Sequence, residues 1–416
     1  MNLSRRQFLS ASAVSACGLW LAPRQILAAS TSITIKTPSG PLIGEQAGAV
    51  KVFRGVPFAE PPVGPLRFRP AMPVKPWRAP REALRFAAAA MQPGEGKWEQ
   101  SEDCLYLNIW APAGKGPFPV YVWIHGGGFT GGASFEPLYD GTGLAEQGIV
   151  CVTVAYRLGA FGFLDMEPVL GAECAASANN GLRDLMMALE WVQKNIAAFG
   201  GDPEQVTIGG ESAGAKLTDI LMGVPAAEPL FQQMISESGG AERVNGLDKA
   251  KEVALGFAEL WQKETGLAPK ALTTAPARQI IQLQQKFIAS WPSHFPLRCE
   301  VDGKLLPRKP VETIRAGSSK GKRLLLGTNR DESAAFVGPH PQHDAGPADL
   351  GNLTAEQFAT VYERYAKLYP EMSVEERRIR ALTAEEYWIP SMRVAEAHVE
   401  GGGEAYVYRL DFSESS

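Results

Sequence analysis

Short and nearly continuous apolar runs recur along the chain, separated by stretches that contain glycine or proline. Runs of this kind are typical of strands that are covered on both faces, as in a parallel sheet between layers of helices. We predict such strands at residues 105–110, 120–124, 149–155, 206–209, 234–236, 324–327 and 405–410. An earlier segment, residues 33–52, alternates short β-type runs with glycine and proline, which predicts a small antiparallel entry region.

Between these runs, apolar residues recur at steps of three and four, the spacing of one helix face. This spacing predicts an amphipathic helix over residues 180–199 that crosses over the sheet, and further helical segments at residues 250–264, 277–289 and 355–397. The segments at 250–264 and 277–289 lie between two strands, so we expect them to form a cap at the carboxyl edge of the sheet. The whole pattern predicts an α/β fold with a mostly parallel central sheet, flanking helices and a helical cap insertion.

The first residues follow a different pattern. Arg5 and Arg6 precede a moderately apolar run, and small residues near position 28 offer a cleavage site, which predicts a twin-arginine export signal over residues 1–29. An apolar run of about 15 residues is short for a membrane-spanning helix. A lipoprotein signal that leaves Cys17 lipid-bearing is a minor alternative, because the apolar run continues beyond this cysteine. We therefore expect a periplasmic or secreted product without an integral membrane segment in its mature chain.

Composition narrows the remaining possibilities. A chain of 416 residues with 45% hydrophobic content can bury one large core, so we expect residues 30–416 to form a single domain. Its net charge is -4, and no basic block interrupts the mixture of charges, which argues against nucleic acid as a partner. No histidine or cysteine spacing resembles a zinc site and no glycine motif resembles a phosphate loop, so neither a metal nor an organic cofactor is expected.

Four cysteines follow the predicted signal: Cys104, Cys151, Cys174 and Cys299. An even number in an exported protein allows disulfides. Against pairing, Cys151 lies within a predicted buried strand, which is a usual place for an inert free thiol. The pattern leaves the pairing open.

The pentapeptide at residues 210–214 reads Gly-Glu-Ser-Ala-Gly and carries the first candidate chemistry. It follows a predicted strand and precedes a helical pattern, the context in which a G-x-S-x-G motif presents a nucleophilic serine on a sharp turn. Glycines two positions before and after the serine allow that turn. We therefore predict that Ser212 is a nucleophile; for the motif without its context, a chance match is the alternative.

A second glycine-rich segment, His-Gly-Gly-Gly-Phe at residues 125–129, follows the predicted strand 120–124. Successive glycines leave backbone N–H groups exposed, and such donors can bind the oxygen that becomes negative when an ester carbonyl is attacked. We assign the oxyanion hole to the N–H groups of Gly127, Gly128 and Ala213. A flexible loop is the alternative for a glycine triplet, but a buried strand before each motif favours acyl transfer.

With these motifs the chain resembles the type-B carboxylesterase and cholinesterase family of the α/β-hydrolase fold. The resemblance covers nearly everything after the predicted signal. It rests on the segments at residues 53–62, 101–108, 125–129, 156–159, 195–203 and 210–214, in one order. It implies a serine carboxylesterase that hydrolyses small-molecule esters through an acyl-enzyme, with Ser212 as the nucleophile. It also implies that Cys104 is unpaired, because Ala90 stands where the family often carries the partner cysteine.

The resemblance further implies the acid and the base of the triad. The family's acid is a glutamate in an Asn-x-Asp-Glu turn after a strand, which corresponds to Glu332 here, with Asp331 as a second choice. The family's histidine follows a strand that resembles residues 406–412, so we expect it beyond residue 416 in a chain truncated at its C-terminus. The histidines present have other expected roles: His125 braces the glycine loop and His294 lies in the cap. His340 and His343 lie too near the acid, and His398 is the least unfavourable substitute.

Two other functions stay open at this stage. A non-catalytic cholinesterase-like binding protein would share the fold, although retention of Ser212, Glu332 and the glycine triplet argues against it. An amidase or lipase would use the same groups and differ in its pocket. Acyl and alcohol specificity and the oligomeric state are not determined by these patterns.

Overall fold

The computed structural model describes residues 30–94, 96–336 and 350–411. The predicted export signal with Cys17, and the histidines His340 and His343, lie outside the described residues. Within the described ranges, no helix is long and apolar enough to cross a membrane.

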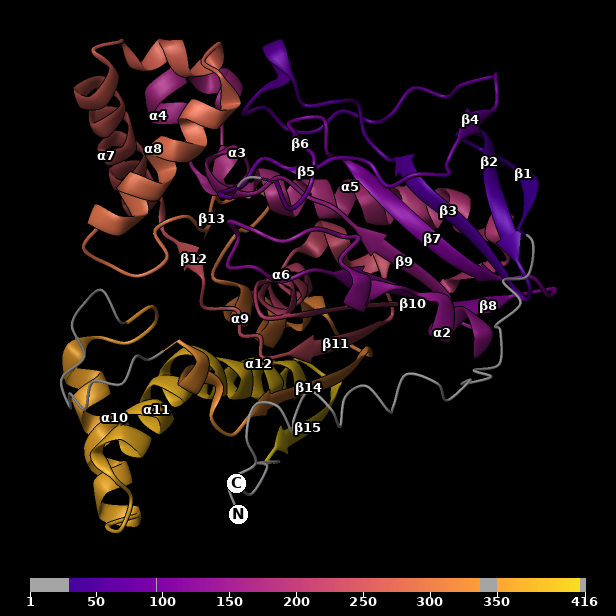
Figure 1. Cartoon of the computed structure of the whole chain (residues 1–416). Helices are drawn as coiled ribbons and strands as arrows, with labels where there is room; N and C mark the ends of the chain where they lie inside the picture. The colour runs from indigo at the N-terminus through magenta and orange to yellow at the C-terminus, as the bar shows by residue number, and fades with distance from the viewer. Residues whose placement is uncertain (1–29, 95, 337–349, 412–416) are drawn as a thin grey trace, which may run out of the picture.

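The described part of the chain is organised around an eleven-stranded mixed sheet (Figure 1). Its first strands pair antiparallel, which confirms the predicted entry region: β1 (Thr31–Thr37), β2 (Gly40–Ala47) and β3 (Val50–Pro57). Strand β7 (Tyr106–Pro112) continues this block and runs antiparallel to both of its neighbours. The short strand β4 (Arg81–Glu82) lies beside β2.

The rest of the sheet is parallel and follows the spatial order β9-β8-β10-β11-β14-β15. These strands are β9 (Val150–Val154), β8 (Phe118–Ile124), β10 (Gly201–Glu211), β11 (Gln233–Glu237), β14 (Arg323–Asn329) and β15 (Glu404–Leu410). They confirm the predicted apolar strands. Strand β10 begins earlier than predicted, because Gly201 already pairs with Phe118 before an irregularity in the ladder.

Chain order reverses at β8, and this reversal locates the site. The chain passes from β8 to β9 on one side and then returns to β10 on the other side. Such a switch point opens a crevice at the carboxyl ends of the strands, where α/β proteins bind ligands. The glycine loop follows β8 and the serine turn follows β10, so both predicted motifs meet at this crevice.

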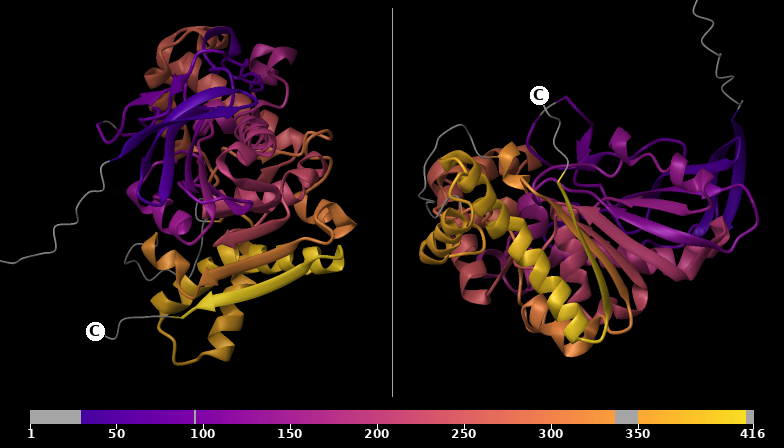
Figure 2. Two further views of the ribbon diagram at one scale, coloured as in Figure 1. Left: turned by 90° about the vertical axis from the view of Figure 1, so that its right-hand side faces the viewer. Right: turned by 90° about the horizontal axis from the view of Figure 1, so that it is seen from below.

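Helices flank the sheet. The predicted helix at 180–199 forms α5 (Asn180–Asn195), which continues as the 3-10 turn Ile196–Phe199 and ends at Gly200 in a left-handed conformation. Helix α6 (Ala213–Met222) packs against β8, β10 and β11. Helix α12 (Ile389–Glu400) lies along β14 and β15, as Figure 2 shows.

The predicted helices of the insertion form α7 (Leu247–Thr265) and α8 (Ala277–Ser290). They pack on each other and gather at one corner of the molecule with α3 (Gly159–Phe163) and α4 (Glu167–Leu170), in the upper left of Figure 1. The predicted helical region 355–397 is divided into α10 (Ala355–Leu368), α11 (Val374–Thr383), a π-helical turn (Ala384–Trp388) and α12. Capping boxes start α10 and α11, which explains these breaks.

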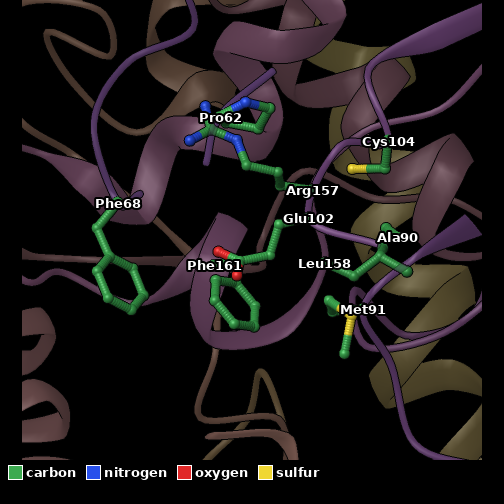
Figure 3. A pocket seen from close by; sticks show the side chains of 9 residues that line it. All are labelled: Pro62, Phe68, Ala90, Met91, Glu102, Cys104, Arg157, Leu158 and Phe161. Carbon is green, nitrogen blue, oxygen red and sulfur yellow. The ribbon is translucent and has the colours of Figure 1, made fainter. Parts of the chain in front are cut away.

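The four cysteines in the described ranges are all buried and free. Cys104 and Ala90 line a small cavity of about 10 Å³ (Figure 3). The other residues around it are Pro62, Phe68, Met91, Glu102, Arg157, Leu158 and Phe161. A space of this size holds at most one water molecule, so it is a packing defect and not a substrate site.

Candidate active site

Ser212 lies between the end of β10 and the start of α6, in a strained backbone conformation with φ 54° and ψ -118°. Two hydrogen bonds hold this conformation. The N–H of Ser212 donates to the carbonyl of Glu237 (2.9 Å), and its own carbonyl accepts from the N–H of Lys216 (2.9 Å). The strand, the helix and the neighbouring strand β11 therefore fix the serine at the carboxyl edge of the sheet.

The glycines of the serine motif are required by the close approach of β8. A Cβ atom added to Gly210 would lie 2.5 Å from the carbonyl oxygen of Ile124, and one added to Gly214 would lie 2.0 Å from the same atom. Both distances are far below van der Waals contact, and the obstacle is backbone. Only glycine at both positions lets α6 start this close to the end of β8.

The glycine loop after β8 runs beside the serine. A Cβ atom at Gly126 would lie 3.3 Å from the Cβ of Ser212. Gly127 and Gly128 have φ values of 111° and 63°, and the carbonyl of Gly127 accepts hydrogen bonds from Thr130 and Gly131. The N–H groups of Gly127 and Gly128 donate to no acceptor among the described residues.

Ala213 supplies the third predicted N–H of the oxyanion hole. It is the first residue of α6, so its N–H has no acceptor within the helix. Two of the predicted donors, the N–H groups of Gly127 and Gly128, thus come from the loop after β8. The third comes from the first residue of α6, which follows Ser212.

Glu332 follows β14 and begins the 3-10 turn Glu332–Ala335. Its carboxylate accepts from the backbone N–H of Asn329 (2.7 Å), from the Asn329 side-chain amide (3.0 Å) and, at short range, from the hydroxyl of Ser238. Asp331, the second choice for the acid, instead forms ion pairs with Arg330 and Arg380. The geometry therefore favours Glu332 over Asp331.

Ser212 and Glu332 line one cavity of about 470 Å³ at the carboxyl ends of β10, β14 and β15. Its other lining residues are Glu211, Asn329, Arg330, Asp331, Ala334, Ala335, Phe336, Tyr387 and Leu410. Burial, together with the charges of Glu332 and Glu237, raises the pKa of Glu211 above its ordinary value. The cavity is large enough for a small ester, and it joins the predicted nucleophile to the predicted acid.

His125 is buried beside the glycine loop, where the sequence led us to expect a brace. Its Nδ1 lies 2.8 Å from the carbonyl oxygen of Gly126, and its ring stacks on Tyr156 with centroids 4.5 Å apart. The Tyr156 hydroxyl donates to the His125 carbonyl (2.8 Å). Burial lowers the pKa of His125 to about 4, so the ring is neutral at pH 7 and holds the loop without a charge.

His398 is not placed to act as the base. His398 is fully buried in α12, with Nδ1 2.8 Å from the hydroxyl of Ser319 and Nε2 3.1 Å from the carbonyl oxygen of Lys322. Lys322 precedes β14 whereas Glu332 follows it, so His398 lies at the opposite end of the strand and its suggested role as a substitute base is wrong. His294 follows α8, and its ring lies 3.6 Å from that of Phe295.

Sequence reasoning missed several polar residues that the fold brings to this region. Ser238 has φ 60° and bonds Glu332, while Lys216 and Asp219 are buried in α6. The residues that they contact are distant in sequence, so local sequence patterns do not indicate these contacts. The one available signal was a lysine and an aspartate three residues apart in an otherwise apolar helix.

The chain was compared with sequence families and with known proteins. A sequence model of the carboxylesterase family matches residues 30–416. A para-nitrobenzyl esterase from Bacillus subtilis (strain 168) is 37% identical over 91% of this chain and 78% of its own length. A fumonisin B1 esterase from Sphingopyxis macrogoltabida is 38% identical over 81% of this chain and 63% of its own length.

Other relatives are longer, and solved structures agree with the sequence matches. An acetylcholinesterase from Danio rerio is 39% identical over 69% of this chain, which spans about half (48%) of that relative. A structure of the PNB esterase has a TM-score of 0.80 at 34% identity and covers 92% of this chain and 81% of its own. A carboxylesterase from Geobacillus stearothermophilus has a TM-score of 0.81 at 34% identity, covering 92% and 80% of the two chains.

Proposed function

The chain belongs to the carboxylesterase family and is by family a carboxylic ester hydrolase, and from this premise we propose that it is a serine esterase with Ser212 as its nucleophile. The observation that carries the proposal is the meeting of three groups at one sheet edge. These are the strained Ser212 turn, the unpaired N–H groups of the loop after β8, and the carboxylate of Glu332 in the same cavity.

In the proposed reaction, the Oγ of Ser212 forms a bond to the ester carbonyl carbon while its proton passes to a base. The N–H groups of Gly127, Gly128 and Ala213 bind the oxygen that becomes negative. The carbon–oxygen bond to the alcohol then breaks, and the alcohol leaves with the proton from the base. A water molecule attacks the acyl-enzyme in the same way and releases the carboxylic acid and free Ser212.

We propose that Glu332 orients a histidine that acts as this base. The family resemblance implies a histidine in this role, and among the described residues the carboxylate of Glu332 accepts hydrogen bonds from Asn329 and Ser238. The hydroxyl of Ser238 and the backbone N–H of Asn329 donate to Oε1, and the Asn329 side-chain amide donates to Oε2, so these bonds support the orientation of the carboxylate.

Covalent labelling tests the nucleophile. An organophosphate should add its phosphoryl group to Ser212 of the unmodified protein, which peptide mass spectrometry detects. We expect Ser212→Ala to lower the hydrolysis of a short-chain p-nitrophenyl ester by about a thousandfold or more, because the acyl-enzyme can no longer form. The matched control is Ser290→Ala, in an exposed serine at the end of α8, which should keep the unmodified rate.

Two results would contradict the proposal. A phosphoryl group on a different residue would remove the nucleophile from Ser212. Equal hydrolysis rates for the unmodified protein and Ser212→Ala would instead favour a non-catalytic binding protein with the same fold.

A further inference from the structure

Helix α6, which begins directly after Ser212, carries two ionisable side chains on its buried face, those of Lys216 and Asp219. Lys216 is 2% exposed and Asp219 is fully buried. Charges in a protein interior are costly unless hydrogen bonds and opposite charges compensate them. Two such residues, about one turn apart in a helix whose only other polar side chain is Thr218, therefore need partners that compensate for their burial.

One partner of each residue belongs to the same peptide group. The ammonium group of Lys216 donates to the carbonyl oxygen of Gly239 (2.9 Å), and the carboxylate of Asp219 accepts from the N–H of Gly240 (2.6 Å). The carbonyl of residue 239 and the N–H of residue 240 are the two polar ends of one planar unit. The lysine and the aspartate thus hold this unit from both ends and fix its orientation.

Close packing of Gly239 against Asp219 and Ser236 further restricts this peptide group. A Cβ atom at Gly239 would lie 2.3 Å from Oδ2 of Asp219 and 2.2 Å from Oγ of Ser236. Ser236, at the end of β11, also donates to Oδ2 of Asp219 (2.9 Å). Gly240 has φ 110°, which side chains rarely adopt. The turn after β11 therefore packs directly against α6.

Lys216 has a second set of contacts beyond the turn. Its Nζ donates to the carbonyl of Glu386 (3.1 Å) and lies 3.2 Å from the carboxylate oxygen Oε1 of the same residue. The ammonium group also lies 4.8 Å from the ring centroid of Tyr387, which lines the cavity of Ser212 and Glu332. One lysine therefore joins the turn after β11 to the wall of the candidate site.

Ser238, which precedes the peptide group between residues 239 and 240, connects this group to Glu332. Ser238 has φ 60°, its N–H donates to the carbonyl of Gly327 (2.7 Å), and its hydroxyl donates to Glu332 at short range. Ser238 is bonded to Gly239, so a displacement of Gly239 away from α6 would move Ser238 with it. The position of the Ser238 hydroxyl therefore depends on the hydrogen bonds that Lys216 and Asp219 make to the next peptide group.

We propose that Lys216 and Asp219 are positioning residues, which clamp the turn Ser238–Gly240 and thereby hold the carboxylate of Glu332 in register with Ser212. The proposal rests on the proposed function, since Glu332 matters for catalysis only if Ser212 is the nucleophile. Its physical basis is that both side chains belong to the helix that begins at the nucleophile and that both hydrogen-bond the turn after β11. Helix α6 thus fixes the nucleophile at its start and the acid through its side chains.

Substitution of Asp219 separates positioning from general stability. We expect Asp219→Leu to lower kcat for a short-chain p-nitrophenyl ester by about a hundredfold, the usual cost of a misplacement near 1 Å, with KM nearly unchanged. Asp219→Asn keeps an oxygen acceptor for the N–H of Gly240, so it should recover most of kcat. The matched control is Leu221→Ala, a fully buried residue of α6, which should lower the melting temperature but keep kcat.

Two kinetic results would overturn the proposal. One is an unchanged kcat in Asp219→Leu. The other is an equal loss of kcat in Leu221→Ala, which would show that any loosening of α6 has the same effect.

Hydrogen exchange tests the clamp independently of ester hydrolysis, so its outcome is separate from that of the proposed function. In Asp219→Leu and Lys216→Met, peptides covering residues 236–241 and 329–335 should both exchange faster than in the unmodified protein. Leu221→Ala should leave the ratio of these two peptides to the rest of the chain unchanged. Unaltered exchange at residues 329–335 in both clamp variants would overturn the link to Glu332.

Discussion

Ser212 adopts a backbone conformation that few residues other than glycine tolerate, and its surroundings impose that conformation. The N–H and the carbonyl of Ser212 are both engaged by neighbouring backbone, while Gly210 and Gly214 let β8 approach within contact distance. Strain of this kind is maintained only where packing over-determines it. The serine turn is therefore sensitive to single methyl groups.

Gly214→Ala should show this sensitivity. Its new methyl group would lie 2.0 Å from a backbone oxygen, so α6 must shift. We expect a loss of about 1–3 kcal/mol in the free energy of unfolding, measured by urea denaturation, together with a loss of esterase activity. Gly143→Ala in α2 (Thr142–Glu146) is the control, because nothing lies within 4 Å of its Cβ position. That control should gain up to about 1 kcal/mol, and equal losses in both variants would contradict the argument.

Glu300, in β13 (Cys299–Glu300), provides a prediction on pH. It is 1% exposed, and neither carboxylate oxygen has a described hydrogen-bond partner. Burial, followed by the charges of Asp165 and Asp302, raises its pKa from 4.5 to about 8, against the opposing effect of Arg183; Glu167 adds to the increase. The carboxyl group is therefore protonated in the folded protein at neutral pH.

The sign of the effect follows from the two pKa values. Between pH 4.5 and about pH 8 the unfolded chain has released the proton and the folded chain still holds it. Stability therefore falls as pH rises through this window, by up to about 1.4 kcal/mol per pH unit. In Glu300→Gln, urea denaturation at several pH values should show a shallower fall and greater stability than the unmodified protein at pH 9. The exposed Glu204→Gln should follow the unmodified protein, and an identical pH dependence in Glu300→Gln would contradict the prediction.

At the residue scale, the sequence located the groups whose roles depend on local motifs. Ser212 and the glycine loop were found because each follows an apolar strand, and Glu332 was found through the family turn. Ser238, Lys216 and Asp219 were not found, because their roles depend on contacts between segments that lie far apart in sequence. Glu300 was missed for the same reason, since its burial arises from tertiary packing.

Elements were predicted well wherever periodicity was strong. Helix α5 and the apolar strands of the parallel block lie where the patterns placed them. Strand β10 was predicted too short, because its first residues, Gly201 to Gln205, are small or polar and pair beyond an irregularity. The division of the region 355–397 follows from capping residues, Thr354 and Ser373, which hydrophobic periodicity does not detect.

Strand β5 (Ala89–Ala90) pairs with β6 (Gln100–Ser101), and Cys104 follows β6. This pairing offers a position for an engineered disulfide. Ala90 and the free thiol of Cys104 line the same small cavity (Figure 3). We expect Ala90→Cys to form a disulfide with Cys104 in oxidising buffer and to stabilise the fold by about 3 kcal/mol, since the closed loop is about 15 residues long.

Thiol counting and thermal melting with and without reductant measure this effect. Cys104→Ala in the Ala90→Cys background is the control, and it should show no dependence on reductant. Persistence of both thiols under oxidising conditions would contradict the predicted pairing.

For the whole molecule, the fold class, the parallel block and the order of the two motifs could be predicted, because they follow from the alternation of strands and helices. The position of the switch point at β8 could not, since the sequence does not tell on which side of a strand its successor pairs. That choice is made by packing, and it is what brings the loop after β8 next to Ser212.

Export is a prediction about the whole chain, and we propose that residues 1–29 direct it through a twin-arginine route. Replacing Arg5 and Arg6 together by lysine should retain the protein in the cytoplasm of a host with this pathway, as measured by cell fractionation. Arg24→Lys, outside the motif, is the control and should leave export unchanged. Export of the double variant would contradict the proposal, and palmitate label on the protein that is lost in Cys17→Ser would establish the lipoprotein alternative.

Strand β15 ends the sheet and, among the described strands, pairs only with β14. Within the described ranges its outer edge has no strand partner, and Tyr406, Val407 and Leu410 are 60%, 42% and 56% exposed. An edge of this composition can act as a template onto which another extended chain adds a strand. Preparations of the purified protein should therefore grow in particle size with concentration. A proline at a backbone position that faces outward from β15 is the change most suited to keep them monodisperse.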